Sequence, residues 1–166
     1  MLALLLLVSV AVTVWVLNAP AQRFLPSFAR LLADPVVEGG AWSLLSGRST
    51  ASGTFGGRDV AILLKLKRGR HDQGYLVVAM RTGEPAALDA AGIDARASDD
   101  GARRALFDLA RHDLRLHAEE GWLKAVWQPQ GFVIFPGGFS ESRWRDVLQA
   151  LEAVAASLDA VASPSA

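Results

Sequence analysis

The chain opens with an uninterrupted apolar run. Residues 1–22 contain no charged side chain, and Arg23 is the first one. A helix over this stretch, at about 1.5 Å per residue, reaches roughly the 30 Å of a bilayer core. Trp15 falls near its far end, where aromatic rings favour the lipid headgroups. A domain of this size cannot enclose a helix that is apolar on all sides. The pattern therefore predicts a single-pass transmembrane helix or signal segment over 1–22.

The fate and orientation of this segment stay open. Ala19-Pro20-Ala21 is a small-residue pattern that would permit cleavage after Ala21. No Lys or Arg precedes the apolar run, which favours a retained anchor instead. Arg23 and Arg30 follow the span, so the positive-inside rule favours the cytoplasmic face of the membrane. A cleaved signal would export the domain.

Residues 23–40 read as a juxtamembrane connector. Pro26 suits the first turn of a short helix that Pro35 would end, with Phe28, Leu31 and Leu32 on one side. Glu38-Gly39-Gly40 then reads as a hinge. This places one α+β domain over 41–162 and a disordered tail over 163–166.

The first sheet unit, from about Ser49, shows strand alternation. Gly56-Gly57 suits a type I′ hairpin turn, because both central residues need positive φ. The next strand places Val60, Ile62, Leu64 and Leu66 on one face and Ala61, Leu63, Lys65 and Lys67 on the other. A polar tip over 68–74 leads to a strand over 75–80. The pattern predicts a meander of up to three strands.

Two helices are expected in the middle of the chain. Residues 85–91 can form a short helix that Gly92 would stop. Asp99 or Asp100 would cap a second helix that runs to about His112. Its inward side would carry Ala105, Leu106 and Leu109.

The second sheet unit is centred on a tight turn at Glu120-Gly121. This turn pairs Leu116 with Ala125 and Ala118 with Leu123, and a shift by one residue would bury Lys124. A further turn at Pro129-Gln130 would bring Phe132 and Ile134 beside Trp127 and Ala125.

The last helix is expected from the Ser140 N-cap to about Val161. Its apolar stripe consists of Val147, Leu148, Leu151, Val154, Ala155, Leu158 and Val161, with Trp144 in the core. Each half of the chain thus reads as a meander followed by a helix. The predicted fold is α+β: an N-terminal transmembrane helix, then a two-layer sandwich of antiparallel meanders with two helices on one face.

The segment from Gly53 to Val60 carries a resemblance. Gly53, Gly57, Arg58 and Val60, placed after an apolar N-terminal span, resemble the opening strand of uncharacterised bacterial membrane-anchored proteins. The resemblance implies a small α+β domain on a membrane anchor and brings no activity with it.

Composition removes several classes of function. Lys plus Arg and Asp plus Glu both number 17, so the net charge is zero and no global field attracts nucleic acid. The chain has no cysteine, which excludes disulfides and thiolate chemistry. The 3 histidines lack a metal-binding spacing, and Ser140 lacks the setting of a nucleophile. We therefore assign no catalytic residue, metal or cofactor, and no nucleic-acid partner.

Two surfaces remain as candidates for binding. The first is the outward face of the second sheet unit, which is more apolar than water requires: Trp122, Val126, Val133 and Phe135. The second is a basic hairpin tip, suited to an anionic partner: Lys65, Lys67, Arg68 and Arg70.

These surfaces favour a non-enzymatic, membrane-anchored interaction module that binds a protein or itself. The alternative is a carrier for a small apolar ligand held between the sheet and the last helix. A third hypothesis is an enzyme of unrecognised type.

Overall fold

The computed structural model describes residues 5–12, 25–38, 48–65, 75–83, 86–97, 99–127 and 140–162. Its strands are β1 (Ala33–Glu38), β2 (Arg48–Phe55), β3 (Arg58–Lys65), β4 (Tyr75–Arg81), β5 (Arg115–Glu119) and β6 (Trp122–Trp127). Its labelled helices are α3 (Ala90–Arg96), α4 (Asp100–Arg111) and α5 (Glu141–Ala162). Residues 5–12 and 25–29 are also helical.

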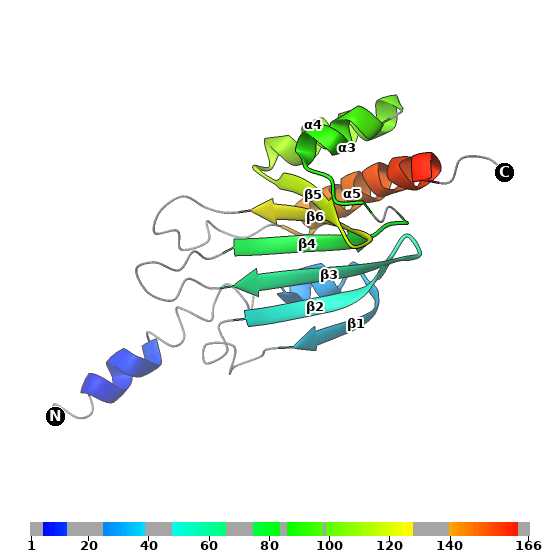
Figure 1. Cartoon of the computed structure of the whole chain (residues 1–166). Coiled ribbons are helices and arrows are strands. Elements are labelled where there is room, and N and C mark those ends of the chain that lie inside the picture. Colours follow the sequence, from blue (N-terminus) through cyan, green and yellow to red (C-terminus); the bar gives the residue numbers. More distant parts are fainter. Residues whose placement is uncertain are drawn as a thin grey trace.

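The strands form one antiparallel sheet of six strands in the order β1-β2-β3-β4-β6-β5 (Figure 1). β1 to β4 make a continuous meander. The chain then leaves the sheet through α3 and α4 and returns as the β5–β6 hairpin. β6, the second strand of the hairpin, pairs with β4.

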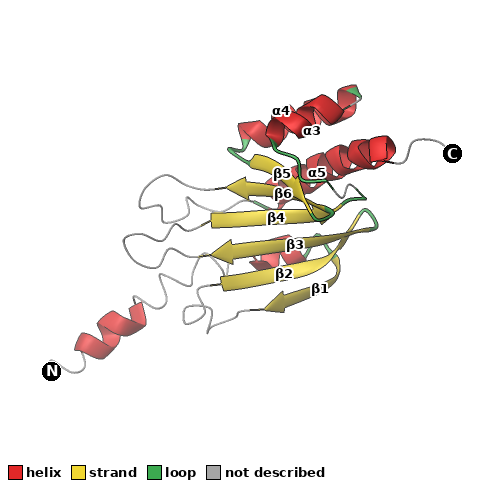
Figure 2. Cartoon of the chain, viewed as in Figure 1, coloured by secondary structure: helices red, strands yellow, loops and turns green. Residues whose placement is uncertain are grey.

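The helices lie to one side of the sheet, as Figure 2 shows. α5 contacts β4 and β6, and α4 packs on α5. Alternate residues of β3 and β4 are buried beneath them, which is the period of two expected of a sheet with one covered face. The predicted α+β architecture with an antiparallel sheet is confirmed.

Both predicted hairpin turns are present. Gly56 and Gly57 have φ of 58° and 79°, and Glu120 and Gly121 have φ of 54° and 76°. Positive φ at both central residues is what a type I′ turn requires. The turn at Glu120 fixes the predicted register, with Leu116 opposite Ala125.

The predicted connector over 23–40 is not separate from the domain. Leu25, Phe28 and Leu32 are buried in the core, and the Phe28 ring meets Trp144 edge to face with centroids 5.3 Å apart. Residues 33–38 then form edge strand β1, with an irregularity in the pairing between Ala33 and Val36. Pro35 falls at this irregularity, a position that tolerates its missing N–H. The domain therefore includes residues from 25 onward.

The predicted pairing of Phe132 and Ile134 with the strand that contains Ala125 and Trp127 is wrong. β6 pairs with β4 on one side and β5 on the other, so Ala125 has Val78 and Leu116 as its neighbours. No edge of β6 remains for Phe132 or Ile134, which lie outside the described residues. The apolar strand β4, which is distant in the sequence, pairs with β6 at the edge that was predicted for the segment after the Pro129-Gln130 turn.

Two helix boundaries also differ from expectation. α3 begins at Ala90 and runs through Gly92, because the Asp89 side chain accepts a hydrogen bond from Gly92 N and so caps the helix. α4 begins after its Asp99 cap as predicted. α5 begins after Ser140, whose hydroxyl accepts from Arg143 N. Val161, expected in the stripe of α5, is 43% exposed because it lies beyond the sheet.

Each residue of the Gly53–Val60 motif has a structural role. A Cβ at Gly53 would lie 2.7 Å from the Ala33 carbonyl oxygen, so the close packing of residues 32–33 on β2 requires glycine. Gly57 supplies the positive φ of the turn. The Arg58 guanidinium pairs with Asp159 of α5, and Val60 is buried.

The N-terminal segment is described only over residues 5–12, a helix whose side chains are exposed. Within the described ranges, no helix has the length and apolar character needed to cross a bilayer.

Candidate functional site

The face of the sheet opposite the helices carries an apolar row across three strands. Leu63 of β3, Val77 of β4 and Val126 of β6 lie side by side in the register. All three are half-buried, whereas their chain neighbours on the other face are fully buried, except Trp127, which is partly buried. No described helix covers this face (Figure 2). We call this surface the outer sheet face and define it by Leu63, Val77, Val126 and Trp122.

Trp122 lies at the far end of β6 and is also half-buried. The Arg81 guanidinium sits 5.3 Å from the centroid of its ring, a cation–π distance. At the other end of the sheet, Lys65 Nζ lies 5.5 Å from the Tyr75 ring centroid. At each end of the apolar row, a cation therefore lies over the face of an aromatic ring.

The outer sheet face has more basic than acidic side chains. On the four strands around the apolar row, β3, β4, β6 and β5, alternation places four cations, Lys65, Arg81, Arg115 and Lys124, and two carboxylates, Asp59 and Glu119. Glu38 shares this face on edge strand β1. Lys124 Nζ is 2.8 Å from Glu119 Oε2, and this ion pair lowers the pKa of Glu119. Burial, followed by the charge of Lys124, lowers the pKa of His117 on the same face.

The structure brings together part of each predicted surface. Trp122 and Val126 share the outer sheet face, as predicted. Val133 and Phe135 lie outside the described residues. The sheet neighbours of Val126 are Val77 of β4 and Arg115 of β5. Val77 and, beyond it, Leu63 belong to the other sheet unit and were not predicted to join this surface. Of the basic tip, Lys65 lies on β3, and Lys67, Arg68 and Arg70 lie outside the described residues.

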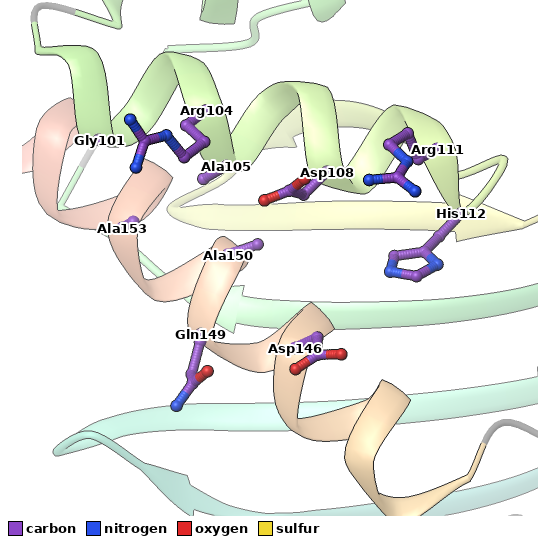
Figure 3. Close-up of a pocket in the computed structure, with 10 residues that line it drawn as sticks. All are labelled: Gly101, Arg104, Ala105, Asp108, Arg111, His112, Asp146, Gln149, Ala150 and Ala153. Atoms are coloured by element: carbon purple, nitrogen blue, oxygen red, sulfur yellow. The ribbon is translucent and has the colours of Figure 1, made fainter.

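A second concave feature was not predicted. An open groove of about 670 Å³ runs between α4 and α5 (Figure 3). The groove is lined by small residues, Gly101, Ala105, Ala150 and Ala153. The polar side chains around them come from both helices and from the end of α4: Arg104, Asp108, Arg111, His112, Asp146 and Gln149. Glycine and alanine at the crossing let the two helices approach, and the long polar side chains then form the walls.

His112 closes one end of this groove, where it caps the C-terminus of α4. Figure 3 shows its ring reaching from the end of α4 toward α5. Its Nδ1 accepts a hydrogen bond of 3.1 Å from Arg143 Nε. Burial, then the charge of Arg143, lowers the pKa of His112, and Asp146 opposes this in part. His112 is therefore a neutral acceptor, and the cationic role expected of a histidine at a helix C-terminus is not the one it has.

The described residues contain no group of three or more side chains suited to hold a metal ion. Asp108 and His112 line the groove on the helical side. His117 is on β5, where alternation directs it to the outer sheet face with Glu119. The sheet thus separates Asp108 and His112 from His117 and Glu119. His71 lies outside the described residues.

A further polar cluster joins the end of α5 to the sheet. Asp159 Oδ1 accepts hydrogen bonds of 2.6 Å from Thr82 Oγ1 and from Gly83 N. Its Oδ2 lies 2.6 Å from Arg58 Nη1. Burial alone would raise the pKa of Asp159, but the bonds from Thr82, Gly83 and Arg58 outweigh it and lower the pKa. Both carboxylate oxygens of Asp159 therefore bind groups at the ends of strands, and they join α5 to the sheet.

No protein-family model, curated protein or solved structure matches this chain.

Proposed function

We propose that the protein is a non-enzymatic, membrane-anchored interaction module that binds a protein partner through its outer sheet face. The supporting observation is the row formed by Leu63, Val77 and Val126, which no described helix covers. A sheet with one solvated face normally alternates apolar and polar residues. This sheet carries apolar residues on both faces of its central strands, which is characteristic of a surface that a partner covers.

The anchor is the uncharged segment over residues 1–22. Its length matches a bilayer core, and its lack of charge removes the main cost of insertion. The cytoplasmic face is the side that the arginines after the span favour, and cleavage after Ala21 would instead release an exported domain.

The chemistry of the partner follows from the border of the outer sheet face. Four cations against two carboxylates favour a partner with an apolar centre and acidic edges. The four strands β3, β4, β6 and β5, at about 4.8 Å spacing and about six residues each, give a face of roughly 400 Å². Stable interfaces bury about 800 Å² per partner. The size therefore favours a transient partner over an obligate dimer.

The carrier hypothesis has less support. The space between the sheet and α5, where an apolar ligand would bind, is filled by large buried side chains: Phe28, Leu76, Trp144, Leu148 and Leu151. The groove between α4 and α5 is polar and open, unlike the apolar enclosure such a ligand requires.

The test is site-specific photocrosslinking of the full chain in cells. A photoreactive phenylalanine at position 126 should form a discrete protein adduct. The same group at Gln149, which is exposed on α5, should not form it. Val77→Thr changes the centre of the row to a polar isostere that keeps the strand preference. It should therefore reduce the adduct at least several-fold.

Val78→Thr is the matched control, since Val78 is the next residue of β4 but lies in the core. A buried hydroxyl without a partner costs about 1–3 kcal/mol, so this variant should melt at a lower temperature. Val77→Thr should change stability by less than about 0.5 kcal/mol. An adduct at position 126 that survives Val77→Thr unchanged, or that forms equally from position 149, would refute binding through the outer sheet face.

A further inference from the structure

The solvent side of α4 carries an exposed aromatic ring between arginines. Phe107 is 65% exposed. At 3.6 residues per turn, Phe107 and three arginines fall within an arc of about 100° on the helix surface, with Phe107 near its centre. The arginines are Arg103, Arg104 and Arg111. The buried residues of α4 lie on the opposite side: Ala102, Ala105 and Leu109. Phe107 therefore points directly away from the core.

The arginines of this arc are available to a ligand. Within the described part of the chain, Arg103, Arg104 and Arg111 are exposed and form no ion pair. Other surface cations do have partners, as Arg145 has Glu141 and Lys124 has Glu119. The acidic residue on this arc is Asp100, at the start of the helix. Arg104 and Arg111 lie where the arc meets the rim of the groove between α4 and α5, and Asp108 lies further into that side. The surface is therefore basic with an apolar centre.

We propose that this side of α4 binds anionic lipid headgroups and so holds the domain against the membrane that residues 1–22 enter. The proposal rests on the membrane anchor of the proposed function. Guanidinium groups bind phosphate in the plane of the headgroups, and an aromatic ring between them inserts at the boundary with the acyl chains. α4 lies with α3 at the edge of the molecule beyond α5 (Figure 1), and its Phe107 side is open to solvent and so can meet a lipid surface.

The anchor makes a weak site sufficient. A covalent tether turns the contact of α4 with lipid into an intramolecular step at high effective concentration. Each arginine near an anionic surface contributes about fivefold to binding, so three contribute on the order of 100-fold. Single-stranded nucleic acid is a poorer match, because it requires several aromatic rings for successive bases and α4 exposes one.

The test labels α4 with a fluorophore. Because the chain has no cysteine, a single introduced cysteine is the one site that a thiol-reactive fluorophore labels. A full-length Phe107→Cys variant carries an environment-sensitive fluorophore such as NBD. It is mixed with vesicles of phosphatidylcholine alone or with about one-third phosphatidylserine. The emission at position 107 should rise and shift to the blue on the anionic vesicles only. It should fall again near 1 M NaCl, where the screening length is about 3 Å.

Two other labelled positions serve as controls. A label at Val8→Cys reports entry of the N-terminal segment and should respond to both kinds of vesicle. A label at Asp59→Cys, exposed on β3, should respond to neither. If position 107 responds while position 8 enters no vesicle, the anchor is wrong and the lipid contact of α4 stands. If position 8 enters and position 107 does not respond to anionic lipid, the α4 proposal is overturned.

The arginines are tested together in the Phe107→Cys background. Arg103→Gln, Arg104→Gln and Arg111→Gln combined should lower the equilibrium constant for contact on the order of 100-fold, which returns the emission to its value on neutral vesicles. Arg145→Gln on α5 should leave the emission unchanged, and equal melting temperatures would show that both variants fold. A position 107 label that responds to polyglutamate or single-stranded DNA but not to anionic vesicles would also overturn the proposal.

Discussion

At the scale of single residues, Gly53 shows how the absence of a side chain fixes the packing of a whole segment. Because Gly53 has no Cβ, the backbone of residue 33 can pack against it. A Cβ at position 53 would lie only 2.7 Å from the Ala33 carbonyl oxygen. Leu32 Cβ lies 2.9 Å from the same position. The segment that carries Phe28 into the core can approach β2 only because of this glycine.

Gly53→Ala should therefore destabilise the fold by about 1–3 kcal/mol, because the obstructing atom is backbone and cannot rotate away. Urea unfolding measures the change. Gly83→Ala is the control, since the nearest atom to its added Cβ would lie at 3.4 Å, an ordinary contact. Equal midpoints for the two variants would show that residues 32–33 do not pack on β2 as described.

Asp159 gives a second residue-scale prediction, on the pH dependence of stability. Its pKa is lowered in the folded state, so its contribution is present above the unfolded pKa and is lost as the pH falls through the folded one. Asp159→Asn should cost about 1–2 kcal/mol at pH 7, since charged hydrogen bonds are lost. The difference in melting temperature from the wild-type chain should narrow below about pH 4. A difference that stays constant from pH 7 to about pH 3 would mean that the carboxylate charge is not what joins α5 to the sheet.

The sequence revealed some of these residues and not others, for a physical reason. Gly56-Gly57 and Asp99 act on their own neighbours, so their roles in a turn and a cap could be read locally. Asp159 acts on Arg58 and Thr82, which are 101 and 77 positions away along the chain. No local pattern distinguishes it from any other acidic residue near the end of an amphipathic helix.

At the scale of elements, the same distinction separates the hairpins from the pairing of β4 with β6. The β5–β6 register follows from one turn and the side-chain period, and it was predicted. The neighbour of β6 on its other side depends on how two distant units meet. Because β4 takes that place, the outer sheet face is built from both units. Val77 consequently takes the place beside Val126 that was predicted for Val133, and Leu63 lies beyond Val77.

The contact of α4 with α5 also carries a prediction. Arg143 donates to His112 Nδ1, and burial and the charge of Arg143 lower the pKa of that imidazole below 6.5. A lowered pKa means that the contribution of His112 is present above the unfolded pKa and is lost as the pH falls through the folded one. An NMR titration should show Arg143→Gln raising the pKa of His112. Arg145→Gln, which breaks the exposed pair with Glu141, should leave it unchanged.

At this same contact, stability should fall more steeply between about pH 7 and 5 in the wild-type chain than in His112→Gln. Protonation adds a proton at the atom that accepts from Arg143, so the bond is lost and two cations face each other. Identical slopes in the two proteins would show that α4 and α5 are held by their apolar contact alone.

At the scale of the whole molecule, the segment expected to be a connector belongs to the domain. The sequence indicated its short helix and apolar side but not its place, because residues 23–40 lie next to the predicted span and contain two prolines and two glycines. In the structure, Leu25, Phe28 and Leu32 are buried among residues of the sheet and α5. In the proposed membrane-anchored arrangement, the link between the apolar segment and the domain is therefore shorter than predicted.

Two truncations separate the anchor from the domain. Deletion of residues 1–22 leaves Leu25, Phe28 and β1 in place, so the remaining chain should unfold cooperatively and no longer sediment with membranes. Deletion of residues 1–40 removes β1 and three core side chains. At about 2–5 kcal/mol for each lost core side chain, the cost of about 6–15 kcal/mol equals the whole stability of a typical domain. The shorter fragment should therefore lack a cooperative thermal transition, as circular dichroism would show. A fragment from residue 41 that melts at the same temperature as the one from residue 23 would show that residues 25–38 are a linker and not part of the core.

Full-length protein that stays in the supernatant with its N-terminus intact would show that residues 1–22 do not anchor the protein.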